Sequence, residues 1–595
     1  MYIRKTKIVC TIGPASENPK ILKKLITGGM DAARINFSHG NHESHLVLTE
    51  NIKKLRAELG VPVALLADTK GPEIRVKQFK KSPVTLTAGE VFTLTTREVD
   101  GTNEIVSVTY SQLPKFLARG NKILLDDGLI ELQVEDTNET DIICRILNGG
   151  PLSNRKSINL PGISTQMPYM DEQDMLDIKF AYDNDFEFLA LSFVRSAKDV
   201  ILVKNYLDSL GPNRLEILSK IENAEGVDNI DEIIRESDGT MVARGDLGVE
   251  IPFEELPAIQ KLIIKKSYTA GKRVITATQM LDSMMRNPRP TRAEVSDIAN
   301  AVYDGTSAIM LSGETAAGKY PLESLEAMRK VAEQTEKAIN YKQRFIESPY
   351  SAAGKNITNA ISHATCSTAH DLGAAAIVTV TRNGSTARMI SRFRPDTPIV
   401  ASTPSIKTYM QMALNWGIIP LLTEFVDSPD ALFKVAAEQT MQAGIAKEGD
   451  LIVITGSATS SASFSTSSIT NSLQVHVLGN LLASGKGAGA QKRVSSRACI
   501  FTRNAPVGQF INGDILVIEK TTTTILRLIK HAKGVVTEEN ASESGAVAAA
   551  IALDIPVVAS AEEATRLITD GGGIVIDSVK GHVYNKNADG IEFMR

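Results

Sequence analysis

Two short motifs, residues 219–223 and 241–248, carry the residue types of a site that handles phosphoryl or enolate oxygens. Side chains alternate along a strand, so Lys220 and Glu222 share one face, and Asp246 can meet them from the next strand. Two carboxylates can bind a divalent cation such as Mg²⁺ with positions left open for a substrate, while a lysine neutralises a phosphoryl or enolate oxygen. The alternative is a structural ion-pair network, which the same residues could form.

A second group of polar residues follows two earlier strand-like runs. Arg34, Asn36 and Ser38 share one face of an extended segment, and an arginine there can fork onto phosphate oxygens. With Asp68 and Thr69 they offer two neutral side chains, one carboxylate and a backbone carbonyl, the donor set of a monovalent-cation cage. A hydrogen-bonded strand end without a ligand is the alternative.

Further hydroxyls and histidines lie near the same strand ends. Thr278 and Ser312 could complete a ring of polar groups, although Ser and Thr in such places commonly cap the next helix. His39, His42 and His45 are spaced along a helix start and have no further ligand set, so we expect surface histidines rather than a metal site.

The elements that position these residues alternate between short β-type runs and longer helical patterns, and several β-type runs end in polar residues. This predicts an α/β chain with a (β/α)₈ TIM barrel. The eight predicted strands are residues 6–10, 32–36, 64–68, 188–193, 216–221, 240–243, 274–277 and 307–311.

The chain of 595 residues is too long for one core, and four domains are expected. The catalytic barrel would comprise 1–71 and 169–345, and the alternating pattern between Pro72 and Pro168 predicts an inserted small β-barrel lid, 72–168, that can expel water. An α/β regulatory domain, 346–474, and an appended small α/β or β/β/α domain, 475–595, would follow. In residues 457–472, 11 of 16 are Ser or Thr, which indicates a loop or linker.

Composition narrows the classes of partner and the compartment. A formal net charge of −4 argues against nucleic acid and against a polybasic membrane patch. No apolar run is long enough to span a bilayer, and the start of the chain does not read as a secretory signal. The four cysteines are too widely spaced for a disulfide framework or a zinc site. We therefore expect a cytoplasmic protein with small-molecule partners.

Taken together, the motifs resemble those of the pyruvate kinase family. They occur in the family's order and cover residues 1 to about 345 densely, while 346–474 is similar to the family's regulatory domain more loosely. The motifs are residues 34–40, 68–75, 159–162, 219–223, 243–248, 276–280, 289–294 and 311–315.

The resemblance implies phosphoryl transfer from phosphoenolpyruvate to ADP, giving pyruvate and ATP in glycolysis, dependent on Mg²⁺ (or Mn²⁺) and activated by K⁺. Lys220 would stabilise the transition state, assisted by Arg34 and Thr278. The substrate would contact Arg34, Lys220, Gly245, Asp246, Thr278 and Ser312. Mg²⁺ would be held by Glu222 and Asp246, K⁺ by Asn36, Ser38, Asp68 and Thr69, and the nucleotide by Arg75, Lys156 and His39. Glu73 matches the K⁺-dependent members of the family.

Three regions bear on regulation and assembly. The segment Thr381, Arg382, Asn383, Gly384, Ser385 and Thr386 resembles the family's effector phosphate loop, with Asn383 where a serine is frequent. The Ser-rich stretch replaces a second, glycine-bearing effector loop. The tail resembles the swivelling phosphohistidine domain of phosphoenolpyruvate-using enzymes, but Gly545 stands where the histidine would be, so a structural or assembly role is expected. The family resemblance also implies a homotetramer.

Two other functions compete with this interpretation. A Mg²⁺-dependent lyase or aldolase could use the same carboxylate pair on the same barrel, but the lid and Arg75 argue against it. A non-catalytic regulatory protein could keep the barrel as a scaffold, but it would have no need of Lys220, Glu222 and Asp246 together.

Overall fold

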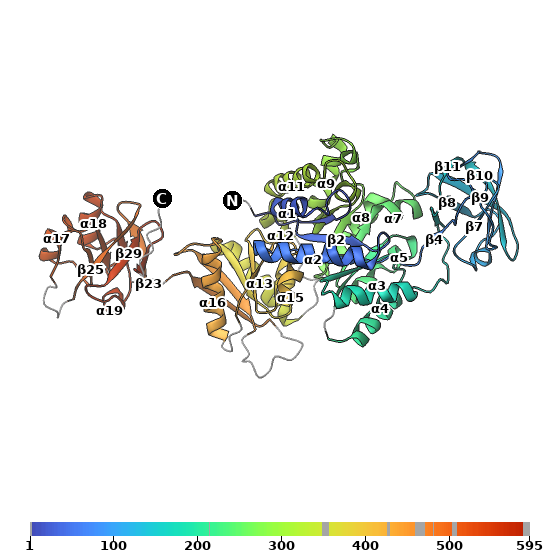
Figure 1. The fold of residues 1–595 in the computed structure, drawn as a ribbon. Coiled ribbons are helices and arrows are strands. Elements are labelled where there is room, and N and C mark those ends of the chain that lie inside the picture. Colours follow the sequence, from blue (N-terminus) through green and yellow to red (C-terminus); the bar gives the residue numbers. More distant parts are fainter. Residues whose placement is uncertain are drawn as a thin grey trace.

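The computed structural model describes residues 3–212, 215–347, 356–424, 429–457, 470–479, 481–502 and 509–586. Its centre is a closed ring of parallel strands in the order β1-β17-β16-β15-β14-β13-β3-β2 (Figure 1). The strands are β1 (Lys7–Thr11), β2 (Ala32–Asn36), β3 (Ala64–Asp68), β13 (Phe188–Leu191), β14 (Glu216–Ile221), β15 (Gly239–Ala243), β16 (Arg273–Ala277) and β17 (Ala308–Leu311). The predicted (β/α)₈ barrel is confirmed.

Each ring strand is a short, almost wholly buried run, because helices cover the outside of the ring and side chains fill its interior. The helices are α1 (Pro19–Gly28), α2 (His42–Leu59), α3 (Glu172–Asp183), α4 (Ala197–Leu210), α5 (Ala224–Asp228), α6 (Ile230–Glu236), α7 (Arg244–Glu250), α8 (Leu256–Thr269), η2 (Asp282–Met285), α9 (Arg292–Asp304), α10 (Gly313–Ala316), α11 (Pro321–Ala338) and α12 (Tyr341–Glu347).

Caps fix where the outer helices begin. Asn41 and Ser44 form a capping box at the start of α2, and Thr291 and Glu294 form one at the start of α9. Gly60 ends α2 with φ of 64°, a left-handed conformation that glycine adopts without strain.

The lid is a sheet of order β4-β12-β8-β9-β10-β6-β7 with a separate β5-β11 pair, inserted between β3 and β13. It has its own apolar core, in which Phe92, Leu132 and Ile142 are buried. Its elements are β4 (Ile74–Arg75), β5 (Val84–Leu86), β6 (Val91–Thr95), β7 (Ile105–Ser107), η1 (Leu113–Phe116), β8 (Lys122–Leu125), β9 (Ile130–Thr137), β10 (Asp141–Asn148), β11 (Gly150–Leu152) and β12 (Ser157–Asn159).

The next domain is a sheet of order β20-β19-β18-β21-β22, in which only β22 is antiparallel to its neighbour. Strand β22 runs past the predicted domain limit at 474, so we propose placing that limit after Val477. The elements are α13 (Ile357–Leu372), β18 (Ala376–Val380), α14 (Ser385–Ser391), β19 (Ile399–Thr403), α15 (Ile406–Met412), β20 (Ile418–Leu422), α16 (Pro429–Gln442), β21 (Leu451–Gly456) and β22 (Ser472–Val477). Most of the predicted Ser-rich loop, 458–469, lies outside the described residues.

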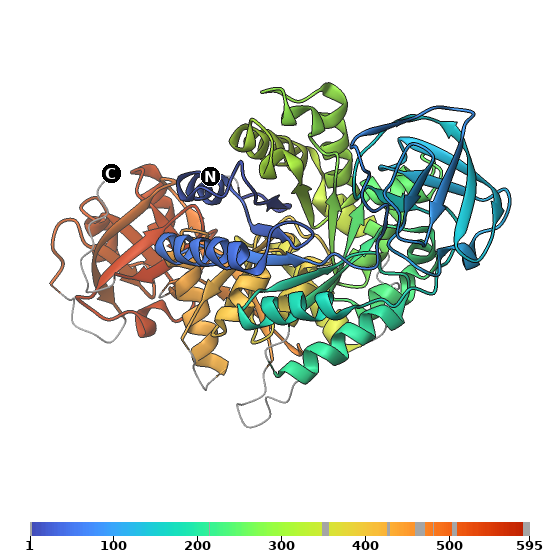
Figure 2. The same ribbon diagram turned by 45° about the vertical axis from the view of Figure 1, so that its right-hand side comes forward.

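The tail forms a fourth sheet, of order β23-β30-β29-β25-β26-β27-β28-β24, at the opposite end of the molecule from the lid (Figures 1 and 2). Lys580 binds Asp450 of the preceding domain at 2.7 Å, and Arg493 binds Glu448 at 2.9 Å. The elements are β23 (Leu481–Ser484), β24 (Lys486–Ala488), β25 (Arg493–Phe501), β26 (Ile515–Ile518), α17 (Thr523–Ile529), β27 (Gly534–Thr537), α18 (Gly545–Ala552), β28 (Val557–Ala559), α19 (Ala564–Leu567), β29 (Gly573–Asp577) and β30 (His582–Asn585).

All four cysteines are free and buried, as the sequence led us to expect. Within the described residues, no helix is both long enough and apolar enough to cross a membrane.

One buried ion pair ties the outer layer of the barrel to the ring. Arg56 of α2 binds Glu187 at 3.1 Å, and Glu187 also accepts the backbone N–H of Leu65 at 2.6 Å. We predict that Arg56→Met costs about 3–5 kcal/mol of barrel stability, because it leaves a buried carboxylate without its cation. Denaturant unfolding measures the loss. The control Arg329→Met removes only the surface pair with Glu333 and should cost less than about 1 kcal/mol; equal costs would contradict the prediction.

Candidate active site

Lys220, near the carboxyl end of β14, is the centre of a buried network of charges. Its Nζ lies 3.0 Å from Oδ1 of Asp68, 3.1 Å from Oε1 of Glu222 and 2.7 Å from Oγ of Ser192. The three partners come from the ends of β3, β14 and β13, which stand side by side in the ring. The parallel strands thus bring residues that are far apart in the sequence to one point. Lys220 and Glu222 lie together there, as predicted.

Arg34 of β2 enters the same network through Asp68. Its Nε binds Oδ2 of Asp68 at 2.5 Å, and its Nη1 donates to Oγ1 of Thr11 at 2.9 Å. Asp68 is only 1% exposed and so balances two cations in a place where water cannot. The guanidinium and the ammonium are thereby fixed beside each other, an arrangement suited to holding a phosphoryl group.

The protonation of these groups follows from burial and from their charges. Burial would lower the pKa of Lys220, but the charges of Asp68 and Glu222 outweigh it and hold that pKa above its ordinary value. Burial opposes the charged form of Asp68 too, yet Arg34 and Lys220 keep its pKa low. The lysine is therefore a fixed cation at neutral pH.

Glu222 and Asp246 form the candidate site for a divalent metal. Burial raises the pKa of Glu222 to about 7 against the pull of Lys220, and burial also raises the pKa of Asp246. Two neighbouring carboxylates whose charged forms are both disfavoured suit a hard cation, which would relieve their repulsion. The described residues hold no group of three or more His, Cys, Asp or Glu arranged for a metal.

Thr278 and Gly245 meet where β15 and β16 end. The backbone N–H of Gly245 donates to Oγ1 of Thr278 at 2.7 Å, and Thr278 has a left-handed φ of 66°. Arg244 fixes this turn, because its Nη2 donates to the carbonyl of Thr278 at 2.7 Å and its Nη1 binds Asp297 at 2.7 Å. The strained turn thus aims the hydroxyl at the start of α7.

Ser312 follows the end of β17 on the same side of the ring. Its backbone N–H donates to Glu314 at 2.7 Å, and its buried hydroxyl has no hydrogen-bond partner among the described residues. An unpaired buried hydroxyl is costly, so this group is available to a ligand.

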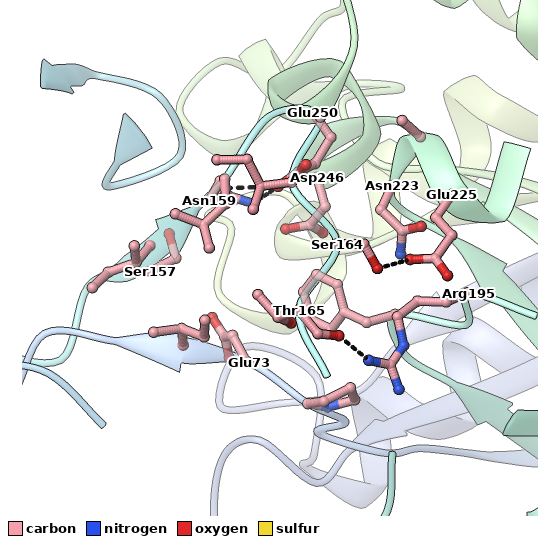
Figure 3. Close-up of a pocket in the computed structure, with 18 of the residues that line it drawn as sticks. Glu73, Ser157, Asn159, Ser164, Thr165, Arg195, Asn223, Glu225, Asp246 and Glu250 are labelled. Atoms are coloured by element: carbon pink, nitrogen blue, oxygen red, sulfur yellow. Dashed lines mark hydrogen bonds between the residues drawn. The ribbon is translucent and has the colours of Figure 1, made fainter. Parts of the chain in front are cut away.

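The pocket between lid and barrel opens beside Asp246 (Figure 3). It is lined on the lid side by Glu73 and Asn159 and on the barrel side by Arg195 and Glu250. Asn159 Nδ2 donates to Glu250 Oε1 at 3.0 Å, and the N–H of Leu160 donates to the same oxygen at 3.3 Å. This pair, the lid latch, joins β12 to the end of α7.

The predicted nucleotide residues are spread over the lid and the barrel. Arg75 binds Glu73 at 2.7 Å, and Lys156 binds Asp126 at 2.7 Å, both within the lid. His39 is exposed on the barrel loop after β2. The structure therefore does not bring these three into one contact network.

The expectation that all three histidines lie on the surface is wrong for His45, which is 8% exposed and stacks on Phe37 at 4.8 Å. His42 is partly exposed, binds Asp177 at 2.6 Å and stacks on Phe180. The reason is that the first turn of α2 packs its rings against aromatic residues instead of projecting them into solvent.

The residues predicted for K⁺ surround the Arg34 network without forming a closed cage. Asn36 Oδ1 accepts the N–H of Ser38 at 3.1 Å, and the hydroxyl of Thr69 donates to the carbonyl of Ala190 at 3.3 Å. Asp68 is already bound by Arg34 and Lys220. The oxygen donors suit K⁺, and their role stays a prediction.

The predicted effector loop turns at Gly384, whose φ is 75°, and leads into α14. Asn383 Oδ1 accepts the N–H of Ser385 at 3.1 Å, and Thr386 contacts Thr470 at 2.8 Å. The buried hydroxyl of Thr381 has no hydrogen-bond partner within the part of the chain that the structure describes. Effector binding here stays a prediction.

In the tail, Gly545 is the first residue of α18, so the phosphohistidine position holds no side chain. Beside it the Glu539 carboxylate accepts hydrogen bonds from Thr521 and from Ser544, the latter at 2.6 Å. Those hydrogen bonds lower the pKa of Glu539 despite its burial. These contacts stabilise the turn that leads into α18, and Gly545 itself is exposed.

Two residues of the candidate site were not predicted from the sequence. Ser192 donates to the carbonyl of Thr69 at 2.6 Å and contacts Lys220, and Arg195 donates to the carbonyl of Thr165 at 3.1 Å on the segment that returns from the lid. Ser192 ends a predicted strand on the catalytic side, and that position was the available signal. Nothing local to Arg195 marks its partner.

This chain matches known proteins along most of its length. Residues 3–325 match the model "Pyruvate kinase, barrel domain", 359–476 match "Pyruvate kinase, alpha/beta domain", and 510–581 match "PEP-utilising enzyme, mobile domain". The pyruvate kinase of Geobacillus stearothermophilus is 44% identical over 98% of this chain and 99% of its own length, and that of Bacillus licheniformis is 43% identical over 98% and 100%.

A solved structure extends the likeness to three dimensions. The crystal structure of a pyruvate kinase from Cryptosporidium parvum superposes with a TM-score of 0.75 at 37% identity, covering 80% of this chain and 96% of the other. Together with the two matching domain models and the relatives of full length, this shows that the chain belongs to the pyruvate kinase family.

Proposed function

We propose that the chain transfers the phosphoryl group of phosphoenolpyruvate to ADP, giving pyruvate and ATP, with the residue roles set out here. The family assignment makes it a phosphotransferase; the roles, the cations and the partners are proposals. The observation that carries them is the buried network in which Asp68 binds Arg34 and Lys220 and Lys220 binds Glu222, close to Asp246.

In this proposal Arg34 and Lys220 hold the transferring phosphoryl group. Phosphoryl transfer needs positioning and charge neutralisation more than covalent help, and two fixed cations supply both. Glu222 and Asp246 would hold Mg²⁺ or Mn²⁺, which when bound polarises phosphoryl and carboxylate oxygens. The backbone of Gly245 and Asp246, at the start of α7, would receive the substrate carboxylate.

The enolate left after transfer must gain a proton. Thr278 is the candidate to position that step, because its hydroxyl already exchanges hydrogen bonds with Gly245 and with the carbonyl of Ala277. The unpaired hydroxyl of Ser312 is the second polar group available on this side of the ring. The identity of the donor stays open.

The lid would contribute residues to the nucleotide site. Arg75 and Lys156 would meet the nucleotide phosphates as the lid closes, with His39 facing them from the barrel. Closure expels water and so strengthens every charge interaction beneath it.

We further propose a cytoplasmic homotetramer in which Asn36, Ser38, Asp68 and Thr69 hold K⁺. A phosphorylated effector would bind the loop from Thr381 to Thr386. The tail, which lacks a histidine at Gly545, would serve structure or assembly.

A coupled assay tests the reaction: pyruvate formation from phosphoenolpyruvate and ADP in the presence of Mg²⁺. We predict that Lys220→Met lowers kcat by about 10²–10³-fold or more, because a fixed positive charge is lost where negative charge develops. Circular dichroism should show an intact fold. The control Lys204→Met removes only the pair with Glu236 and should keep the wild-type rate.

The same assay separates the competing functions. A lyase or aldolase would release a product without ADP, and a scaffold protein would form no pyruvate. Near-normal turnover in Lys220→Met would contradict the role given to the lysine.

K⁺ dependence is a separate prediction. Replacing Na⁺ with K⁺ should raise kcat/KM for phosphoenolpyruvate, and Glu73→Lys should reduce that response, because an ammonium group would supply the missing positive charge. We expect a difference of about tenfold or more, the effect of one charge-assisted contact. Activity that does not depend on K⁺ would contradict the proposed K⁺ site but not the proposed reaction.

The lid latch gives a prediction about nucleotide binding. Glu250→Ala removes the acceptor of two hydrogen bonds from the lid, so KM for ADP should rise by about tenfold with a smaller change for phosphoenolpyruvate. Steady-state kinetics measure both constants. The control Glu254→Ala changes an exposed neighbour and should change neither. Equal changes in both constants would show that the latch does not act through the lid.

A further inference from the structure

A second cluster of charge lies at the amino-terminal ends of the barrel strands, opposite the active site, where the barrel meets the regulatory domain. None of the described residues that line a narrow cavity there carries a carboxylate. The space in it that a water-sized group can occupy is about 10 Å³, enough for one oxygen atom of an anion whose other atoms would lie in the adjoining wider groove of about 730 Å³. Its cationic lining residues are Lys272, Arg273, Arg388, Arg392 and Arg394.

The carboxylates nearby do not balance these cations. Glu216 bridges two of them, with distances of 2.7 Å to Arg273 and 3.2 Å to Arg388. Arg392 donates to the neutral amide of Asn359 at 3.0 Å, and Lys272 donates to the carbonyl of Ser237 at 2.5 Å. Asp238 adds one negative charge near Lys272 and Arg273, which leaves the cluster strongly positive.

Arg394 is a buried cation of this cluster. It is 5% exposed, lies 4.7 Å from the ring centre of Trp416, and donates to the carbonyl of Gly305 and the hydroxyl of Ser307, both at 3.0 Å. All of these partners are uncharged. Burial lowers the pKa of Arg394 to about 9, and the neighbouring charge of Arg344 adds to the effect.

Two buried guanidinium nitrogens in this cluster have no hydrogen-bond partner among the described residues. They are Nε of Arg394 and Nη1 of Arg273, whose side chain is only 1% exposed. A buried donor without an acceptor, and a buried cation without an anion, are both expensive. A bound oxyanion would supply the acceptors and the charge together.

We propose that this cavity binds a phosphate group, either as inorganic phosphate or as the phosphate of a small monoester, and that the bound group ties the barrel to the regulatory domain. Lys272 and Arg273 come from the barrel, whereas Arg388, Arg392 and Arg394 come from the regulatory domain. Arginine is the residue best suited to such forked contacts with phosphate oxygens. A ligand held from both sides favours one arrangement of the two domains.

The cavity is distinct from the predicted effector loop. That loop precedes α14, whereas Arg388 and Arg392 come from the last turn and the end of the same helix. The wider groove shares Tyr268, Lys272 and Arg392 with the cavity. Its lining adds Ile234, Leu262 and Phe393, so it could receive the apolar body of a phosphate monoester.

Calorimetric titration of inorganic phosphate into the full chain tests the site. The Lys220→Met background weakens phosphate binding in the active site. Adding Arg392→Gln or Arg394→Gln should weaken the remaining phosphate binding by about tenfold or more, the effect of one charge-assisted contact. Arg392 is only half-buried, so this variant tests the site even where Arg394→Gln does not fold. Arg329→Gln, a partly exposed arginine on α11, should leave the binding unchanged.

The outcomes separate the possible sites. Absence of phosphate binding, unchanged affinity in Arg392→Gln, or loss of binding in Ser385→Ala of the effector loop would each overturn the proposal. Phenyl phosphate distinguishes the sources. If it binds more tightly than phosphate and Leu262→Ser removes the gain, the ligand is a monoester lying in the groove; if both bind equally, the ligand is free phosphate.

Discussion

The catalytic end of this molecule depends on one buried carboxylate. Asp68 holds Arg34 with one oxygen and Lys220 with the other, at 2.5 and 3.0 Å, and almost no water reaches it. Removing it would leave two adjacent cations to repel each other in a medium of low dielectric. The strands that carry the three residues are therefore held together by the same charges that, in the proposed mechanism, would bind the phosphoryl group.

Much of this site could be predicted because it obeys local rules. The eight short apolar runs fix the ring, and polar residues just after them converge because all the strands are parallel. Lys220 and Glu222 lie two residues apart on one strand, so their shared face follows from alternation alone. The position of Asp246 could be predicted because it comes after β15, the strand that pairs with the β14 of Lys220 and Glu222.

Contacts between elements far apart in sequence could not be predicted in this way. Asn159 and Glu250 are separated by 91 residues and meet only because the lid folds back onto α7. The packing of His45 against Phe37 depends on how α2 sits on the barrel. The cationic cavity draws on two domains, and no stretch of its residues carries a signal of its own. In each case the information lies in tertiary packing.

The place of the lid in the ring has a consequence for how the fold can vary. The lid leaves from the end of β3 and returns to α3, which leads into β13. Strands β3 and β13 pair directly, with Leu66 opposite Phe188 and Asp68 opposite Ala190. The ladder of backbone hydrogen bonds therefore closes without any help from the intervening segment. The length and sequence of the lid can therefore change at little cost to the stability of the barrel. Evolution can alter the residues that cover the pocket while the barrel residues beneath them keep their positions.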